Sequence, residues 1–369
     1  EVLRSDRLTQ GPAVPAFERA VAEKCGAAHA VAANSATSAL HLACLALDVG
    51  PGDTVWTSPN TFVASANCAR YCGAAVDFVD IDPHTWCMSV ESLRHKLANA
   101  KKARAILPKV VIPVHFAGQS CDMEAIAKLA TEYGFRIIED ASHAIGGAYK
   151  DEPVGNCRYS DITVFSFHAV KIITTGEGGM ALTNSAEIAE RMERLRAHGI
   201  MRDPDKLTHP PDGPWYYEQI ELGFNYRMTD IQAALGLSQL ERLDSYIERR
   251  NTLARRYDHA LRDLPLQLPT VQVENRSAFH VYVVRLKPSA TDKAHRRVFE
   301  SLRQRSIGVN LHYMPVHLQP YYRGLGFAPG QYPEAEAHGK EAITLPMYSA
   351  LTDQQQDQVV DSLQQVLRC

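Results

Sequence analysis

The chain has 369 residues, of which 45% are hydrophobic and 8% aromatic, so it holds ample apolar material for the cores of two domains. Its formal net charge of -3 disfavours a nucleic-acid or membrane-surface role, and no stretch approaches the ~20 apolar residues of a membrane span. The cysteines are scattered and form no C-x-x-C pair, which predicts reduced thiols in a cytoplasmic protein without a structural metal or a disulfide framework.

The first two-thirds of the chain alternate strand-like and helix-like segments. We predict helices within residues 34–47, 62–72 and 122–133, and strands at residues 54–57, 76–79, 110–115, 135–138 and 162–167. Such alternation with short connections is typical of an α/β domain around a mostly parallel central sheet. Cofactor sites in these sheets lie at the carboxyl ends of the strands.

The pattern changes in the last third of the chain. Residues 229–256 are predicted as one long helix, followed by a strand at 279–286, a helix at 293–305 and a final helix that begins near Thr352. We therefore expect a large domain over residues 1–245 and a small C-terminal α+β domain over residues 246–369.

Lys171 and Asp140 each follow one of the predicted strands. Apolar neighbours on both sides of Lys171 predict partial burial and a lowered amine pKa. A lysine and an acid at two strand ends suit pyridoxal phosphate, because the amine forms a Schiff base with the cofactor aldehyde and the carboxylate keeps the pyridine nitrogen protonated. The alternatives are a surface lysine and a helix N-cap.

Small residues open the predicted helix near residue 34, including Ser35, Ala36 and Thr37. The amides and the dipole at a helix N-terminus suit a phosphate group, although an ordinary N-cap has the same sequence pattern. His143, three residues after Asp140, is a candidate hydrogen-bond partner for the phenolic oxygen of the cofactor.

Two other enzyme classes fit the motifs poorly. Ser166, His143 and Asp140 have the residue types of a hydrolase triad, but the chain has no G-x-S-x-G elbow. The run at residues 176–179 is not a G-x-G-x-x-G fingerprint and precedes a predicted strand, which disfavours a dinucleotide site.

The segment at residues 311–322 is dense in aromatic residues and histidines. Tyr313, His317 and Tyr321 are candidates for a sugar or nucleobase pocket, and a loop anchored in the small domain's core is the alternative interpretation. His312 and His317 have no plausible third ligand nearby, so we expect no metal site.

Taken together, these motifs resemble the nucleotide-sugar aminotransferases of the DegT/DnrJ/EryC1/StrS type, which are pyridoxal phosphate enzymes of fold type I. The resemblance covers nearly the whole chain, and the similar segments lie at residues 9–12, 17–18, 34–40, 58–63, 139–143, 166–179 and 223–230. It implies that Phe62 stacks on the pyridine ring and that Ser166 binds the phosphate. It also implies that Asn225 reaches the phosphate of the partner subunit, so the active unit would be a homodimer.

Within that family, residues 115–118 and 121–123, together with the segment from Ser166 to Lys171, are similar to the 4-aminotransferases of pseudaminic acid synthesis. The resemblance implies L-glutamate as donor, pyridoxamine phosphate as the second cofactor form, and a UDP-linked 4-keto-6-deoxy-N-acetylhexosamine as acceptor. Ala169 departs from the usual proline, whereas Lys171 differs from the histidine of the dehydratase members. The alternatives are a GDP-linked sugar of the perosamine type, a dTDP-linked sugar, or a non-catalytic binding protein of the same fold.

Overall fold

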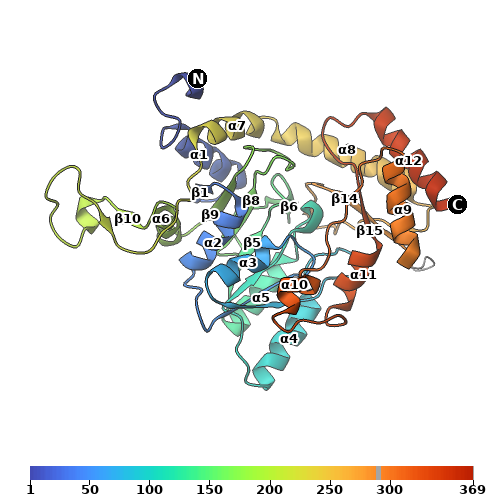
Figure 1. The fold of residues 1–369 in the computed structure, drawn as a ribbon, viewed down its shortest axis with the longest axis horizontal. Helices are drawn as coiled ribbons and strands as arrows, with labels where there is room; N and C mark the ends of the chain where they lie inside the picture. Colours follow the sequence, from blue (N-terminus) through green and yellow to red (C-terminus); the bar gives the residue numbers. More distant parts are fainter. Residues whose placement is uncertain (288–291, 369) are drawn as a thin grey trace.

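The centre of the protein is a seven-stranded sheet, which the computed structural model shows among residues 1–287 and 292–368 (Figure 1). In spatial order its strands are β1 (His29–Ala33), β9 (Gly179–Thr183), β8 (Ile162–Ser166), β5 (Arg136–Asp140), β4 (Val110–Ile112), β2 (Thr54–Thr57) and β3 (Ala75–Phe78). The strands from β8 to β3 pair in parallel, while β9 runs antiparallel to both β8 and β1. The predicted α/β class and mostly parallel sheet are confirmed.

Successive strand residues face opposite sides of this sheet, so an apolar core forms on each side. Val164 of β8 belongs to the core that contains Leu40, whereas its neighbour Phe165 belongs to the core that contains Phe17. Coverage of both faces explains why the interior positions of the strands are mostly apolar. The helices of this part are α1 (Ala13–Cys25), α2 (Ala36–Ala46), α3 (Ala64–Tyr71), α4 (Val90–Lys102), α5 (Met123–Tyr133), α6 (Ala186–Leu195) and α7 (Asp230–Leu240).

A third core lies in the C-terminal part of the chain, around an antiparallel sheet in the order β12-β14-β15. The helices and main strands of this C-terminal part are α8 (Leu243–Leu261), β12 (Leu266–Gln267), β14 (Tyr282–Leu286), α9 (Asp292–Gln304), α10 (Pro320–Arg323), α11 (Pro333–Glu341), β15 (Ala342–Leu345) and α12 (Asp353–Arg368). Short strands complete the structure: β6 (Ala148–Tyr149), β7 (Glu152–Pro153), β10 (Ile200–Met201), β11 (Glu218–Gln219) and β13 (Asn275–Arg276).

The single helix predicted over residues 229–256 is wrong, because the structure has two helices there. Helix α7 begins with a capping box between Thr229 and Gln232, and it ends at Leu240 before α8 begins at Leu243. The break contains no Gly or Pro, and the apolar pattern continues through it. The sequence therefore gives no signal that one helix ends and another begins there. Since α8 runs across residues 245 and 246, the predicted domain boundary at that point stays a prediction.

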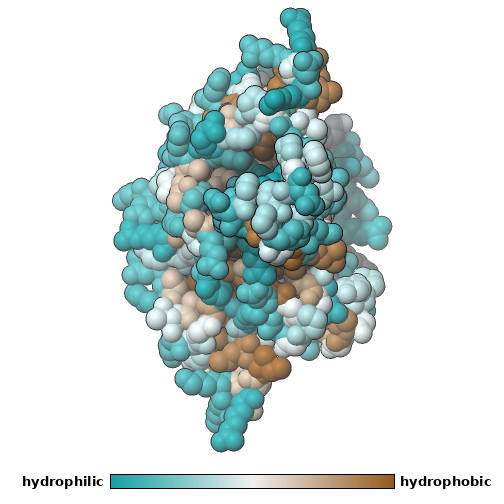
Figure 2. Space-filling model, turned by 90° about the vertical axis from the view of Figure 1, so that its left-hand side faces the viewer, coloured by the Kyte–Doolittle hydropathy of each residue, from teal (hydrophilic) through white to brown (hydrophobic). Residues whose placement is uncertain are grey.

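An arm projects from the body between α6 and α7 and carries the β10–β11 pair (Figure 1). Exposed large apolar residues on this arm include Trp215, which is 73% exposed, and Tyr217. Figure 2 looks at the molecule from the side on which the arm projects, where brown apolar areas alternate with hydrophilic ones. Among the described residues, no helix has the length and apolar character needed to cross a bilayer.

The start of β9 lies against the start of α2 without room for a side chain. A Cβ atom added to Gly179 would lie 2.4 Å from the backbone nitrogen of Ala36 and 2.5 Å from the carbonyl carbon of Ser35. Because backbone atoms cannot rotate away as a flexible side chain can, only glycine allows this approach. The contact joins the sheet to the helix that begins at the site described below.

We expect Gly179→Ala to lower the free energy of unfolding by about 1–3 kcal/mol, because the added methyl group forces α2 away from β9. Urea denaturation of the cofactor-free protein measures this change. Gly50→Ala is the matched control, since a Cβ atom there meets nothing within 4 Å. Equal stability of the two variants would contradict the proposed close contact.

Candidate active site

A cavity of about 510 Å³ opens where β5 and β8 end. This volume lies in the range of small-molecule sites, and the position follows the rule for parallel sheets. Of the residues predicted to act together, the structure brings the following to its lining: Ser35, Ala36, Thr37, Phe62, Asp140, His143, Ser166, Lys171 and Tyr313. Segments as distant in sequence as α2 and the loop before α10 therefore meet at one point.

Asp140 is the last residue of β5, and its side chain is only 4% exposed. The Oδ2 atom accepts a hydrogen bond from Ser65 Oγ at 2.6 Å, and Oδ1 accepts one from the backbone N–H of Ser142 at 3.1 Å. The backbone N–H of Asp140 donates to the Pro113 carbonyl at 2.9 Å. A carboxylate oriented by donors on both oxygens in a buried site is suited to pair with a cationic group.

Lys171 lies in the turn after β8 and is partly buried. The turn is tightened by the Lys171 N–H, which donates to the His168 carbonyl, and by the Thr175 N–H, which donates to the Phe167 carbonyl, each at 2.9 Å. Burial lowers the pKa of the Lys171 amine to about 8, while the negative charge of Asp140 acts in the opposite direction. A pKa of about 8 leaves roughly a tenth of the amine unprotonated at pH 7, which allows it to act as a base.

The start of α2 forms the opposite end of the cavity. Ser35 caps the helix by accepting a hydrogen bond from the Ser38 N–H at 3.1 Å, and Ala36 and Thr37 line the cavity in the first turn. Ser166 reaches the same cavity from the end of β8. Hydroxyl groups and a helix N-terminus are features that bind phosphate groups.

Neutral imidazoles line the remaining side. His143 Nε2 lies 3.1 Å from the hydroxyl oxygen of Tyr313, and the two rings are nearly parallel at 20°. Burial, followed by the charge of Lys171, holds the pKa of His143 well below its usual value. The same causes lower the pKa of His280 well below its usual value and that of His312 to about 4.

Three residues of the site were not among the predicted site residues. Ser65 donates a hydrogen bond to Asp140, and His280 and His312 line the cavity. Ser65 lies on α3, where its hydroxyl also contacts the Thr61 hydroxyl at 2.7 Å. The four-residue spacing of two hydroxyl residues at a helix start was the only available signal. His280 precedes β14 and reaches the cavity through tertiary packing, which no local pattern indicates.

Three predicted site residues lie outside the cavity lining. Asn225 is exposed on the loop before α7. His317 is fully buried, and its Nε2 atom lies 3.0 Å from Glu336 Oε1. Tyr321 is 56% exposed, and its hydroxyl accepts a hydrogen bond from Arg70 Nε at 3.4 Å. A single chain therefore does not bring these three side chains to Lys171.

The cavity fits pyridoxal phosphate as judged from its own side chains. It offers an amine for the aldehyde, a buried carboxylate for the ring nitrogen, and hydroxyl groups with a helix N-terminus for the phosphate. Phe62, 59% exposed at the cavity, offers an aromatic face for the ring. The Nδ1 atom of His143 is buried without a hydrogen-bond partner among the described residues, so it can form a hydrogen bond with a bound ligand.

Comparison with known proteins agrees with this assignment. A family model described as the DegT/DnrJ/EryC1/StrS aminotransferase family matches residues 1–364. GDP-perosamine synthase of Caulobacter vibrioides is 38% identical over 353 residues, which cover 95% of this chain and 89% of that protein.

Two solved structures are similar over the full length. Helicobacter pylori PseC, an aminotransferase involved in the biosynthesis of pseudoaminic acid, is 30% identical with a TM-score of 0.89, and the match covers 100% of this chain and 94% of that one. The Streptococcus pneumoniae protein Spr1654, described as a sugar aminotransferase, is 31% identical with a TM-score of 0.89, again over 100% and 94%. Spr1654 is represented in forms with pyridoxal phosphate and pyridoxamine phosphate.

We expect the reactivity of Lys171 toward an amine reagent in the cofactor-free protein to rise with a midpoint near pH 8. Asp140→Asn should move this midpoint to lower pH, because the lost negative charge had favoured the protonated amine. Competitive acetylation at graded pH, followed by peptide mass spectrometry, measures both midpoints. A midpoint near the ordinary lysine value of about 10.4 would show that the amine is not desolvated.

Proposed function

The chain belongs to the DegT/DnrJ/EryC1/StrS aminotransferase family, and we propose that it transfers an amino group from L-glutamate to C4 of a UDP-linked 4-keto-6-deoxy-N-acetylhexosamine. The matched family model is that of an aminotransferase family, and a similar sugar aminotransferase is known with both cofactor forms, so the chain is a pyridoxal phosphate-dependent sugar aminotransferase. The observation that carries the proposal is the meeting of Lys171, Asp140 and the start of α2 in one cavity.

Different residues of the chain would bind different parts of the cofactor. When bound, pyridoxal phosphate supplies an aldehyde that takes up an amino group and a ring that accepts electron density. Asp140 would hold the ring nitrogen, and His143 would donate to or accept from the phenolic oxygen. The start of α2 with Ser35, Thr37 and Ser166 would bind the phosphate, while Phe62 would cover one face of the ring.

Lys171 is the residue that moves protons. Its Nζ atom lies in a cavity where the buried imidazoles of His143, His280 and His312 have lowered pKa values, and within the described residues Lys171 is the one lysine or arginine that lines the cavity. An amine with a pKa of about 8 can take a proton from carbon in one half of the reaction and return it in the other. Solvent exclusion around the partly buried amine strengthens its interaction with Asp140.

The acceptor is proposed from similarity and from the polar groups that remain at the cavity. PseC matches the whole chain, and residues 115–118 and 166–171 are similar to enzymes of that pathway. Tyr313 supplies a hydroxyl group and an aromatic face at the cavity, which suit a neutral sugar. Because His317 and Tyr321 lie elsewhere in this chain, we retain Tyr313 alone as the substrate residue.

A GDP-linked 4-keto sugar is the second candidate. It is favoured by the 38% identity to GDP-perosamine synthase, which exceeds the 30% identity to PseC. The chemistry at Lys171 is the same for both, so the two proposals differ in the sugar nucleotide that binds and not in the residue that moves the proton.

The expected result of a substrate panel is the highest kcat/KM for the UDP-linked 4-keto sugar with L-glutamate as donor. The assay compares UDP-, GDP- and dTDP-linked 4-keto sugars and identifies each product by its mass. Lys171→Ala is the control and should give no turnover with any of them. Preference for the GDP-linked sugar would replace the first proposal by the second, and inactivity with all three would reject both.

We further propose that the active unit is a homodimer whose sites are completed by Asn225 of the second copy. Asn225 is exposed in a single chain, yet its loop is tied to the phosphate region, because the Asn34 N–H donates to the Tyr226 carbonyl at 2.7 Å. A two-fold interface would place each loop against the other chain's site. The exposed Trp215 and Tyr217 on the adjacent arm provide apolar area for such an interface.

Mixing two inactive proteins tests this composite site. Lys171→Ala and Asn225→Ala should each be inactive, and subunit exchange between them should restore up to about a quarter of the wild-type activity, because one site of each mixed dimer keeps both residues. Activity is measured before and after exchange, with each variant alone as control. A fully active Asn225→Ala protein, or an active monomer in sedimentation, would contradict the proposal.

A further inference from the structure

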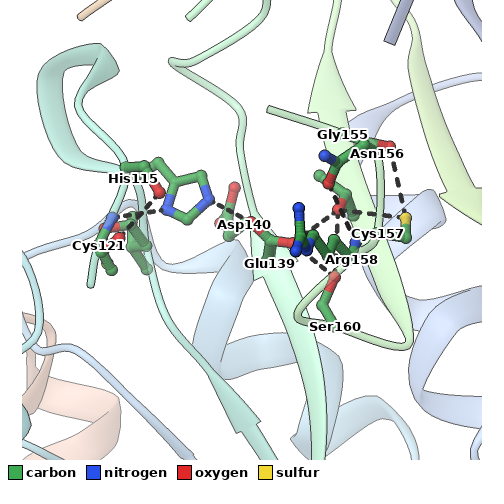
Figure 3. A network of polar contacts seen from close by, with 12 residues as sticks. His115, Cys121, Glu139, Asp140, Gly155, Asn156, Cys157, Arg158 and Ser160 are labelled. Carbon is green, nitrogen blue, oxygen red and sulfur yellow. Dashed lines mark hydrogen bonds and ion pairs between the residues drawn. The ribbon is translucent and has the colours of Figure 1, made fainter. Parts of the chain in front are cut away.

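Directly behind the cofactor cavity lies a second buried carboxylate that the proposed reaction does not use. Glu139 precedes Asp140 on β5, so its side chain points to the opposite face of the sheet. Only 5% of Glu139 is exposed, and its Oε1 atom accepts hydrogen bonds from Thr163 Oγ1 at 3.0 Å and from Ser160 Oγ. Its Oε2 atom lies 2.6 Å from His115 Nε2 (Figure 3).

The hydrogen bonds of His115 determine the charges of this pair. The ring is fully buried, and its Nδ1 atom accepts a hydrogen bond from the Cys121 N–H at 3.2 Å. Since Nδ1 is an acceptor, the single ring proton is on Nε2 and is donated to Glu139. Donors on His115, Ser160 and Thr163 thus meet the two oxygens of Glu139, an arrangement that suits the carboxylate form of this side chain. Glu139 is therefore a buried carboxylate whose two oxygens both accept hydrogen bonds.

The pair is joined to Asp140 through the backbone. The N–H of His115 donates to the carbonyl of Asp140 at 3.0 Å, and Val114 forms a parallel bridge with Asp140. On the other side, Thr163 is the strand neighbour of Glu139 in β8. The Glu139 side chain thus ties β5 to β8 and to the segment that follows β4, at the level where the Asp140 side chain leaves the sheet.

We propose that the Glu139–His115 pair is a positioning device that fixes where the Asp140 carboxylate meets the ring nitrogen of the cofactor. The proposal rests on the role assigned to Asp140 above. Packing alone does not require a charge here, because apolar side chains of similar volume fill such a space without the desolvation cost of a buried carboxylate. The directional bonds of Glu139 supply the orientation that apolar contacts lack.

The test compares two ligands that differ only in the ring nitrogen. Pyridoxal phosphate and its 1-deaza analogue, which has carbon in place of that nitrogen, are titrated into the cofactor-free protein. The dissociation constant of the analogue divided by that of pyridoxal phosphate reports the interaction of Asp140 with the nitrogen, because a stronger interaction makes this ratio larger. Glu139→Gln should reduce this ratio about fivefold or more and leave the affinity for the analogue nearly unchanged.

Two further variants separate positioning from general stability. Thr163→Val removes one donor to Glu139 with little change of shape and should reduce the ratio in the same direction by a smaller factor. Glu152→Gln removes a carboxylate from an exposed pair with Arg158 near the same strands and should leave the ratio unchanged. Thermal unfolding of each cofactor-free protein shows whether a variant is folded before it is titrated.

The double variant Glu139→Gln with Asp140→Asn completes a double-mutant cycle. If Glu139 acts through Asp140, the double variant should have the ratio of Asp140→Asn alone. An equal loss of affinity for both ligands in Glu139→Gln would make the pair merely structural and overturn the proposal. A ratio that Asp140→Asn does not change would instead reject the role of Asp140 and the proposal with it, and it would leave the aminotransferase assignment intact.

Discussion

The site depends on one buried carboxylate held at the end of a central strand. Asp140 lies where β5 ends between β4 and β8, and Ser65 and Ser142 each donate to one of its oxygens. A strand in the middle of a sheet cannot shift without breaking hydrogen bonds on both sides. The position of Asp140 is therefore fixed by the fold before any ligand binds, which is the preorganisation that electrostatic catalysis requires.

The electrostatics of the cavity follow from that position. Lys171 is desolvated enough for its pKa to fall to about 8, but the charge of Asp140 limits the decrease. His143, His280 and His312 face the same space and stay neutral near pH 7, because their burial and the cation of Lys171 both disfavour a second positive charge. A cation and a buried anion that share a low-dielectric space interact more strongly than the same pair in water.

The C-terminal part of the chain closes the cavity through a small set of directional contacts. The Tyr313 N–H donates to Asn60 Oδ1 at 3.2 Å, and the Val316 N–H donates to the Pro59 carbonyl at 2.9 Å. His312 is held from behind, because its Nδ1 atom lies 2.8 Å from Thr344 Oγ1 of β15. The loop that precedes α3 thus serves two purposes: it supplies Phe62 to the cavity and anchors the segment that carries Tyr313.

The sequence by itself determined the class of the fold and predicted that Lys171, Asp140 and the start of α2 lie at one site, because strand periodicity, helix-start residues and apolar flanks are local signals. It did not determine the break between α7 and α8, since no residue at Glu241 or Arg242 opposes helix. Ser65, His280 and His312 entered the cavity only through packing between segments far apart in the chain. His317 has the same residue type as His312, yet it faces Glu336 in the interior, because tertiary contacts and not local sequence decide which way each side chain of that loop points.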